Sequence, residues 1–182
     1  MVVLVTSNEG KYFEFKKILG DTLKRVSLDL EEIQSLSLEE VSKHKAKQAY
    51  AQLKEPVIVE DTGLFLDAFN GLPGPFVKFF YEELGKDYAI RLLRAEENRN
   101  AIGRCVITYY DGVHMQCFIG EVKGTITREL TQAKDKAFGF DFCFVPQGYT
   151  QTLAELGIDI KNKISHRANA VLKFQAWHLK NN

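Results

Sequence analysis

The chain has 182 residues, enough for one domain of ordinary size or two small lobes that share a core. Its 24 Lys and Arg residues balance its 24 Asp and Glu residues, which argues against a protein that wraps nucleic acid, because such proteins carry a basic excess. The three cysteines, Cys105, Cys117 and Cys143, lack CxxC spacing and are expected as reduced thiols of a cytoplasmic protein. The sequence has neither a signal-peptide pattern nor an apolar run near the ~20 residues of a membrane helix, so we expect a soluble protein that makes no membrane contact.

The chain opens with a pattern typical of strand, loop and helix. Val2 to Val5 is an apolar, largely β-branched run, as expected of a strand buried on both faces. A helix is predicted over residues 12–19, closed by Gly20. The polar loop between them would direct backbone N–H groups at the positive end of the helix dipole toward an anion. Its residues are Thr6, Ser7, Asn8, Glu9, Gly10 and Lys11. Because the Walker spacing is absent, the residues alone leave an ordinary turn as an equal alternative to a phosphate loop.

A second helix and a second strand follow a segment that holds Glu31 and Glu32. Ser37 and Glu40 have the spacing of a capping box for a helix that runs to about residue 53. The apolar strand over residues 57–59 is predicted to end on Glu60 and Asp61. Carboxylates at a strand end beside a cleft suit magnesium or could orient a water, although a surface turn is an equal alternative.

The rest of the chain predicts a mixed architecture. Gly and Pro interrupt it at residues 71–75, a helix is expected near residues 81–93, and strands near 102–110 and 113–122 flank the turn Asp111-Gly112. Residues 138–146 are aromatic and loop-like, and Ser165 can cap a last helix. We therefore predict an α/β fold in which helices flank a mixed twisted sheet. Four aromatic residues are expected in the core, with a subunit contact as the alternative: Phe76, Phe79, Phe80 and Tyr81.

Two later segments carry groups that suit a nucleotide. One clusters cations and donors at a helix start, which suits phosphate or a carbonyl-bearing base, and includes Lys161, Asn162, Lys163, Ser165, His166 and Arg167. The other offers aromatic faces with one acceptor for a purine, at Phe138, Gly139, Phe140 and Asp141. Each signal is weak alone, since aromatic residues are more often core and lysines more often solvated. Their occurrence together favours a nucleotide site.

These residues resemble the inosine triphosphate pyrophosphatase family, which hydrolyses noncanonical purine nucleoside triphosphates. Four motifs occur in the family's order and span nearly the whole chain: T-S-N-x-G-K at residues 6–11, E-D-[ST]-G-L at 60–64, G-x-P-G at 71–74 and K-N-x-x-S-H-R at 161–167. The string over residues 72–80 looks more like the eukaryotic and archaeal branch.

The resemblance implies one catalytic domain over residues 1–182, with two lobes and a nucleotide cleft between them. It implies hydrolysis of ITP, dITP and XTP to the monophosphate and pyrophosphate, Mg²⁺ as cofactor and a homodimer. The alternatives are a pyrophosphatase for modified pyrimidines or dTTP analogues and a nucleotide-binding module without catalysis.

The resemblance also assigns roles to residues. Asp61 would accept the proton of the attacking water and would hold Mg²⁺ together with Glu32, with Glu60 as an additional ligand candidate. The triphosphate would bind residues 6–11, with Lys45 and Lys78 facing the phosphates and Thr62 touching the substrate. The base pocket would be formed by Phe138, Gly139, Phe140 and Asp141 and closed by Lys161, His166 and Arg167. Arg167 or a loop amide would donate to the purine 6-oxo group and so reject ATP. The base pocket departs from the family pattern at Phe140 (usually Tyr or Trp), Phe142 (usually Pro) and Ala168 (commonly Gly).

Overall fold

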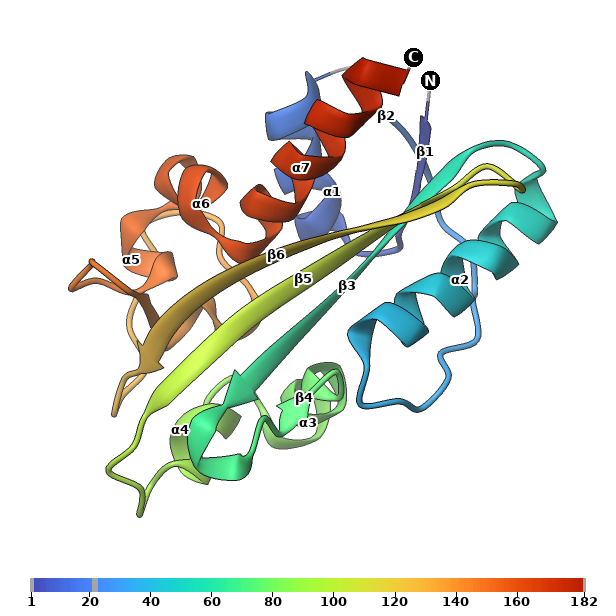
Figure 1. Ribbon diagram of the computed structural model, residues 1–182. Helices are drawn as coiled ribbons and strands as arrows, with labels where there is room; N and C mark the ends of the chain where they lie inside the picture. The colour runs from blue at the N-terminus through green and yellow to red at the C-terminus, as the bar shows by residue number, and fades with distance from the viewer. Residues whose placement is uncertain (1, 21–22, 182) are drawn as a thin grey trace.

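A single twisted sheet runs through the protein and carries helices on both faces (Figure 1). The computed structural model describes residues 2–20 and 23–181. Within these residues seven strands pair in the order β2-β1-β3-β5-β6-β7, with β4 beside β3. β1 is parallel to β2 and β3, whereas the other pairs are antiparallel, which confirms the predicted mixed α/β sheet. The strands are β1 Val2–Val5, β2 Leu23–Val26, β3 Val57–Leu66, β4 Pro73–Gly74, β5 Asn100–Tyr110, β6 Met115–Ile126 and β7 Phe144–Pro146.

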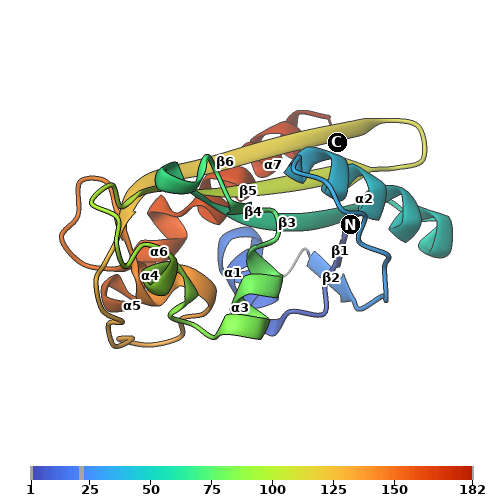
Figure 2. The same ribbon diagram turned by 90° about the horizontal axis from the view of Figure 1, so that it is seen from below.

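The long helices cover opposite faces of the sheet, and the short ones gather around the far ends of its long strands (Figures 1 and 2). α7 and α1 pack together on one face, and α2 packs against β3 and β5 on the other. None of the described helices combines the length and apolar character required to cross a membrane. The helices are α1 Glu9–Leu19, α2 Leu38–Leu53, η2 Asp67–Phe69, α3 Val77–Leu84, α4 Tyr88–Leu92, η3 Gly139–Phe142, α5 Leu153–Leu156, α6 Ile158–Ile164 and α7 His166–Asn181.

β1 is buried on both faces, as its apolar run predicts. Val2 and Leu4 pack with α1 and α7, and Val3 and Val5 pack with α2. The alternation follows from the period of two along a strand. β1 therefore contacts both helical layers. The loop that follows its carboxyl end lies at the boundary between these layers.

The helix after this loop begins earlier than predicted. α1 starts at Glu9 instead of Tyr12, because the Asn8 side chain accepts the backbone N–H of Lys11 at 2.9 Å and caps the helix. Gly10 and Lys11 thus lie in the first helical turn. The predicted close at Gly20 is confirmed.

The prediction that the strand starting at Val57 ends on Glu60 and Asp61 is wrong. Glu60 and Asp61 lie in the middle of β3, which continues to Leu66 because β5 pairs with it along its whole length. Since successive side chains on a strand point to opposite faces, the two carboxylates cannot share one face of the sheet.

The prediction of one helix over residues 81–93 is also wrong. Two short helices, α3 and α4, are separated at Gly85, which has φ 85° and ends α3. The aromatic residues before the break are not all core, since Phe79 is 50% exposed and Tyr81 36% exposed.

Other local predictions hold with changed limits. The Asp111-Gly112 hairpin is confirmed, although its strands extend to residues 100 and 126. Ser37 caps α2, but Glu40 bonds to Ser35 and leaves the capping box half-formed. The loop-like segment 138–146 contains η3 and β7, and β2 has no counterpart among the predicted strands. All three cysteines are free thiols, as expected.

Candidate active site

A cavity of about 450 Å³ lies between the two lobes, one built around β1, β2, α1 and α2 and the other around α3 to α6. Most of its wall is formed by side chains from six parts of the chain: the loop after β1, the segment that precedes α2, strand β3, helix α3, η3 and the α6–α7 junction. Nearly all predicted site residues line it: Thr6, Ser7, Asn8, Lys11, Glu32, Lys45, Thr62, Lys78, Phe138, Gly139, Phe140, Asp141, Lys161, His166 and Arg167. Asp61 is not among the lining residues, but it lies next to the cavity, because its carboxylate contacts Lys45, which lines it. The predicted residues therefore meet in one place although they come from seven separate segments, the six above and α2, which carries Lys45.

The loop after β1 is held from behind by an arginine that sequence reasoning missed. Arg25 on β2 donates to the carbonyl oxygens of Thr6 and Ser7, at 3.0 Å each, and pairs with Glu9. Because these carbonyl groups are turned toward Arg25, the loop can direct N–H groups and hydroxyls at the cavity. Thr6 contributes further by accepting the Asn8 N–H at 3.2 Å. The sequence left an ordinary turn and a phosphate loop as equal alternatives for this segment. The contacts with Arg25 favour the phosphate loop, because they hold the start of α1 in a form suited to an anion.

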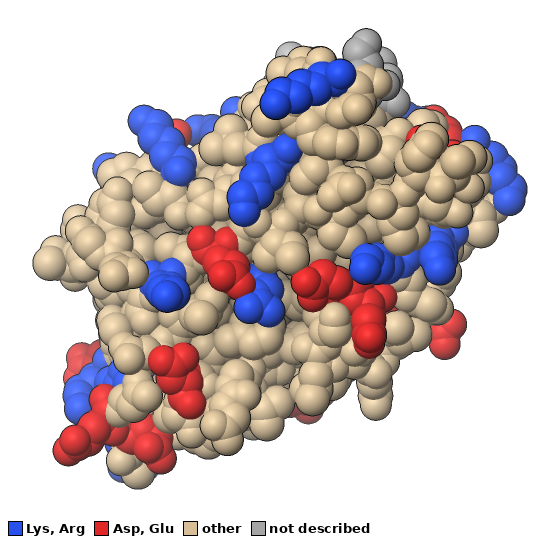
Figure 3. Space-filling model, viewed as in Figure 1, with Lys and Arg blue, Asp and Glu red and all other residues tan. Residues whose placement is uncertain are grey.

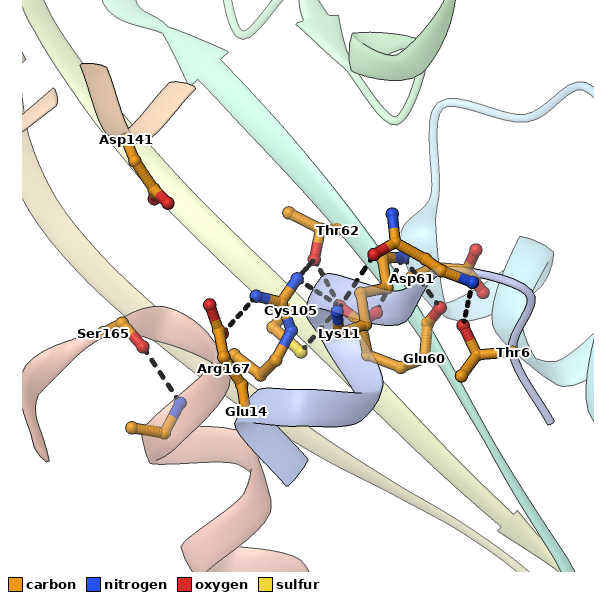
Figure 4. A network of polar contacts seen from close by, with 12 residues as sticks. Thr6, Lys11, Glu14, Glu60, Asp61, Thr62, Cys105, Asp141, Ser165 and Arg167 are labelled. Atoms are coloured by element: carbon orange, nitrogen blue, oxygen red, sulfur yellow. Dashed lines mark hydrogen bonds and ion pairs between the residues drawn. The ribbon is translucent and has the colours of Figure 1, made fainter. Parts of the chain in front are cut away.

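Glu60 points to the face of α1 and α7 and is surrounded by cations (Figure 4). Its carboxylate lies 2.7 Å from Lys11 Nζ and 3.2 Å from an Arg167 nitrogen, and it accepts the Thr62 hydroxyl and the Cys105 thiol. Burial alone would raise the pKa of Glu60, but Arg167 and Lys11 hold it well below the ordinary value. Glu60 is therefore an ionised carboxylate that is fully engaged by the protein.

Asp61 points to the opposite face, toward α2, and its surroundings differ. Its Oδ1 lies 2.7 Å from Lys45 Nζ, whereas Oδ2 is buried without a hydrogen-bond partner among the described residues. Burial raises the pKa of Asp61 in spite of the opposing charges of Lys45 and Lys11. A carboxylate with one free oxygen and a raised pKa is suited to bind a cation or to accept a proton.

Lys45 joins Asp61 to Glu32. The same Nζ lies 2.9 Å from Glu32 Oε1, so one ammonium bridges two carboxylates from different segments. Burial would lower the pKa of Lys45, but the two carboxylates raise it, and the pKa of Glu32 is lowered by Lys45 and Lys78 against its burial.

This carboxylate pair fits a magnesium ion. Among residues 2–20 and 23–181, no group of three or more His, Cys, Asp or Glu is arranged so that it could hold a metal ion. Mg²⁺ nevertheless commonly uses only one or two carboxylates, with waters and phosphate oxygens as its other ligands. Glu32 and Asp61 fit that requirement because their oxygens converge on one cation and Asp61 Oδ2 has no hydrogen-bond partner within the described part of the chain.

A buried chain of alternating charges underlies the other end of the cavity, and Figure 4 shows its part from Glu14 through Arg167 to Glu60 and Lys11. It runs from Asp141 to Lys161 (2.5 Å), Glu14 (2.6 Å) and Arg167 (2.6 Å), and then to Glu60 and Lys11. Glu14 was not among the predicted site residues. The only signal in the sequence is a carboxylate inside the aromatic string at residues 12–15 of a helix, where an exposed position is the ordinary expectation.

Two phenylalanines of the predicted base pocket have different places. The Phe138 ring lies over Lys161 Nζ at 4.3 Å and over the Arg167 guanidinium at 5.3 Å. Phe140 is buried and packs against His166, with ring centroids 5.2 Å apart. Phe138 thus faces the cations, and Phe140 supports the wall of the cavity.

The other departures from the family pattern lie at the edges of this pocket. Phe142 packs under Lys86, whose Nζ is 5.3 Å from the ring, and its carbonyl accepts the Thr131 N–H. Ala168 is fully buried, and its N–H donates to Ser165 Oγ at 3.2 Å, which confirms Ser165 as the cap of α7. Neither position places a charged group in the cavity.

Comparison with known proteins agrees with this arrangement. The chain is 43% identical over 185 residues to dITP/XTP pyrophosphatase of Methanopyrus kandleri, covering 100% of this chain and 97% of that protein. It is 44% identical over 180 residues to inosine triphosphate pyrophosphatase 2 of Trypanosoma cruzi, covering 96% of this chain and 90% of that protein. The solved structure of a HAM1 protein from Coxiella burnetii matches with a TM-score of 0.86 at 26% identity, over 98% of each chain. The Ham1 family model matches residues 2–177, and the chain therefore belongs to the Ham1 family.

Proposed function

We propose that the protein hydrolyses the noncanonical purine nucleoside triphosphates ITP, dITP and XTP to the monophosphate and pyrophosphate, and so cleanses the nucleotide pool. The observation that carries this proposal is the meeting, in one cavity, of a helix N-terminus, a carboxylate pair and an aromatic wall over buried cations. Relatives that cover nearly the whole chain bear the names dITP/XTP pyrophosphatase and inosine triphosphate pyrophosphatase, which supports it.

In this proposal the triphosphate lies along residues 6–11, Lys45 and Lys78. Asp61 orients the attacking water and accepts its proton at Oδ2, the oxygen that no described residue engages. Glu32 and Asp61 hold Mg²⁺, which when bound would gather phosphate oxygens and offset their charge. Lys11, Lys45 and the N–H groups at the start of α1 stabilise the charge that develops on the departing pyrophosphate.

The base is proposed to stack on Phe138 and to be read by residues 138–141, Lys161, His166 and Arg167. A donor toward the 6-oxo group accepts hypoxanthine or xanthine and rejects adenine, whose amino group would leave that donor unpaired. Both terminal nitrogens of Arg167 are engaged by Glu14, Glu60 and Thr62. Arg167 Nε, in contrast, is buried without a hydrogen-bond partner among the described residues, so the candidate donors to the 6-oxo group are this N–H and a backbone amide of the 138–141 loop.

We further propose that residues 1–182 act as one domain, that the protein is a cytoplasmic homodimer and that it binds neither nucleic acid nor membranes. Basic and acidic side chains are interspersed on the face seen in Figure 3, and the chain carries no net charge, which supports a small substrate over a polyanion.

Steady-state hydrolysis of ITP, dITP, XTP, ATP, GTP and dTTP, with magnesium and with EDTA, tests the proposed function. We expect kcat/KM for the first three to exceed that for ATP and GTP by roughly 100-fold or more, and EDTA to abolish turnover. Equal rates with all six would contradict the substrate class. A preference for dTTP would support a pyrimidine-directed enzyme, and binding without turnover would support a nucleotide-binding module.

A further inference from the structure

We propose that Lys45 competes with the divalent cation: its ammonium holds Glu32 and Asp61 together in the metal-free protein and leaves them for substrate phosphate when the cation binds. This inference rests on the proposed function, because it takes Glu32 and Asp61 as the metal ligands.

The geometry gives Lys45 the position of a cation between two ligands. Its Nζ lies 2.9 Å from Glu32 Oε1 and 2.7 Å from Asp61 Oδ1. The three residues come from the segment before α2, from α2 itself and from β3, so the ammonium fastens three parts of the fold at one point. Glu32 and Asp61 would hold a magnesium ion at this point in place of the ammonium, since one or two carboxylates are the protein ligands that Mg²⁺ commonly uses.

The ammonium and a divalent cation cannot both occupy this point. The Lys45 side chain is 14% exposed and that of Asp61 10% exposed, so water screens their interaction poorly. A divalent cation that takes Glu32 Oε1 and Asp61 Oδ1 as ligands therefore displaces the ammonium, and the free energy of the two ion pairs is subtracted from metal binding.

The Lys45 ammonium has a second binding partner within reach, the substrate phosphates. Lys45 lines the same cavity as Thr6, Ser7, Lys11 and Lys78, which are the groups proposed to bind the triphosphate. Its four-carbon stem allows the ammonium to turn from carboxylate to phosphate without movement of α2. Phosphate therefore assists metal binding by drawing the competing ammonium away, and we expect free metal to bind weakly and metal with nucleotide to bind cooperatively.

The test is the affinity for Mn²⁺ alone, measured from the electron paramagnetic resonance signal of the free ion. Lys45→Met and Lys45→Gln, with circular dichroism as the check on folding, are compared with wild type and with Lys47→Met. Lys47 is an exposed residue two positions along α2, and its substitution removes the same charge from the other side of the helix. We expect both Lys45 variants to bind Mn²⁺ between roughly 5- and 150-fold more tightly than wild type, the ordinary range for coupled binding events, and Lys47→Met to match wild type.

Glu32→Gln added to Lys45→Met should remove the gain, since the gain arises at the carboxylate pair. Unchanged or weaker Mn²⁺ affinity in both Lys45 variants would overturn the inference. Its failure is separable from that of the proposed function: wild type that hydrolyses ITP while the Lys45 variants bind Mn²⁺ no more tightly refutes the exchange alone. Tighter Mn²⁺ binding without ITP hydrolysis by wild type refutes the enzyme and leaves the exchange standing.

Discussion

At the scale of single residues, Glu60 and Asp61 are adjacent carboxylates with opposite tasks. Glu60 is engaged by Lys11, Arg167 and Thr62, whereas Asp61 meets Lys45 and keeps one oxygen that no described residue engages. Both oxygens of Glu60 are paired with cations, so this carboxylate is less available to a proton or a metal than Asp61 is. Asp61 is therefore the better base, and Glu60 is poorly placed to act as an additional metal ligand.

Asp61→Asn should lower kcat for ITP by roughly 10²- to 10⁴-fold, the usual contribution of a general base, because an amide cannot accept the proton of water. The similar shape of Asn should preserve the fold and the melting temperature within a few degrees. Asp67→Asn, an exposed carboxyl just beyond the end of β3, serves as the control and should retain full activity. Near-normal turnover by Asp61→Asn would assign the chemistry elsewhere.

At the scale of elements, the buried charges fasten α1 to α6 and α7. Glu14 on α1 bonds to Lys161 of α6 and to Arg167 of α7, at 2.6 Å each. Removing one partner from a buried ion pair leaves its counter-charges uncompensated, at a cost of about 3–5 kcal/mol. These contacts position two proposed base-binding residues.

Glu14→Gln should therefore be markedly less stable than wild type at neutral pH. Burial alone would raise the pKa of Glu14, but Arg167 and Lys161 lower it below the ordinary value. A lowered carboxyl pKa contributes stability that is complete above the unfolded value of ~4.3 and is lost as the pH falls through the folded value. In melts between pH 3 and 8, the difference between the two proteins should thus be greatest above pH ~5 and shrink below ~4.3. Glu83→Gln, at an exposed site, should show no such difference, and a constant gap for Glu14→Gln would exclude this role.

α7 rests directly on β6 at Gly120. A Cβ there would lie 2.0 Å from the His166 carbonyl oxygen and 2.4 Å from the Ala170 nitrogen, both backbone atoms of α7. Gly120→Ala should push α7 outward and destabilise the protein by about 1–3 kcal/mol or more in chemical denaturation. The matched change Gly10→Ala meets the Phe138 ring at 2.8 Å, a side chain that can move. We expect it to keep stability but to raise KM for ITP, and equal stability losses in the two variants would contradict this distinction.

The same elements explain what could be predicted from the sequence. Short-range patterns specify the opening strand β1 and helix α1, the 111–112 hairpin and the caps at Ser37 and Ser165. These features were therefore predictable from the sequence. The length of β3 was not, since its continuation past polar residues depends on pairing with β5, which is remote in sequence. Motif resemblance brought the cavity residues together, but it did not identify Glu14 or Arg25. Their partners lie on other elements, and the sequence marks Glu14 only as a carboxylate within an aromatic string.

At the scale of the whole molecule, exposed apolar side chains on α3 bear on assembly. Phe79 is 50% exposed and Leu84 42% exposed, which suits a contact with another subunit better than solvent. Light scattering after gel filtration should give a mass near twice the chain's 20.7 kDa. A mass of one chain at micromolar concentration would refute the proposed homodimer.

The central claim is hydrolysis of a noncanonical purine triphosphate between its α- and β-phosphates, and its most direct test follows ITP in ¹⁸O-labelled water with magnesium by ³¹P NMR. We predict IMP and pyrophosphate as the only products, with the label in the phosphate of IMP, because the water held by Asp61 attacks the α-phosphorus. Release of IDP and orthophosphate, or a label in pyrophosphate, would contradict the account.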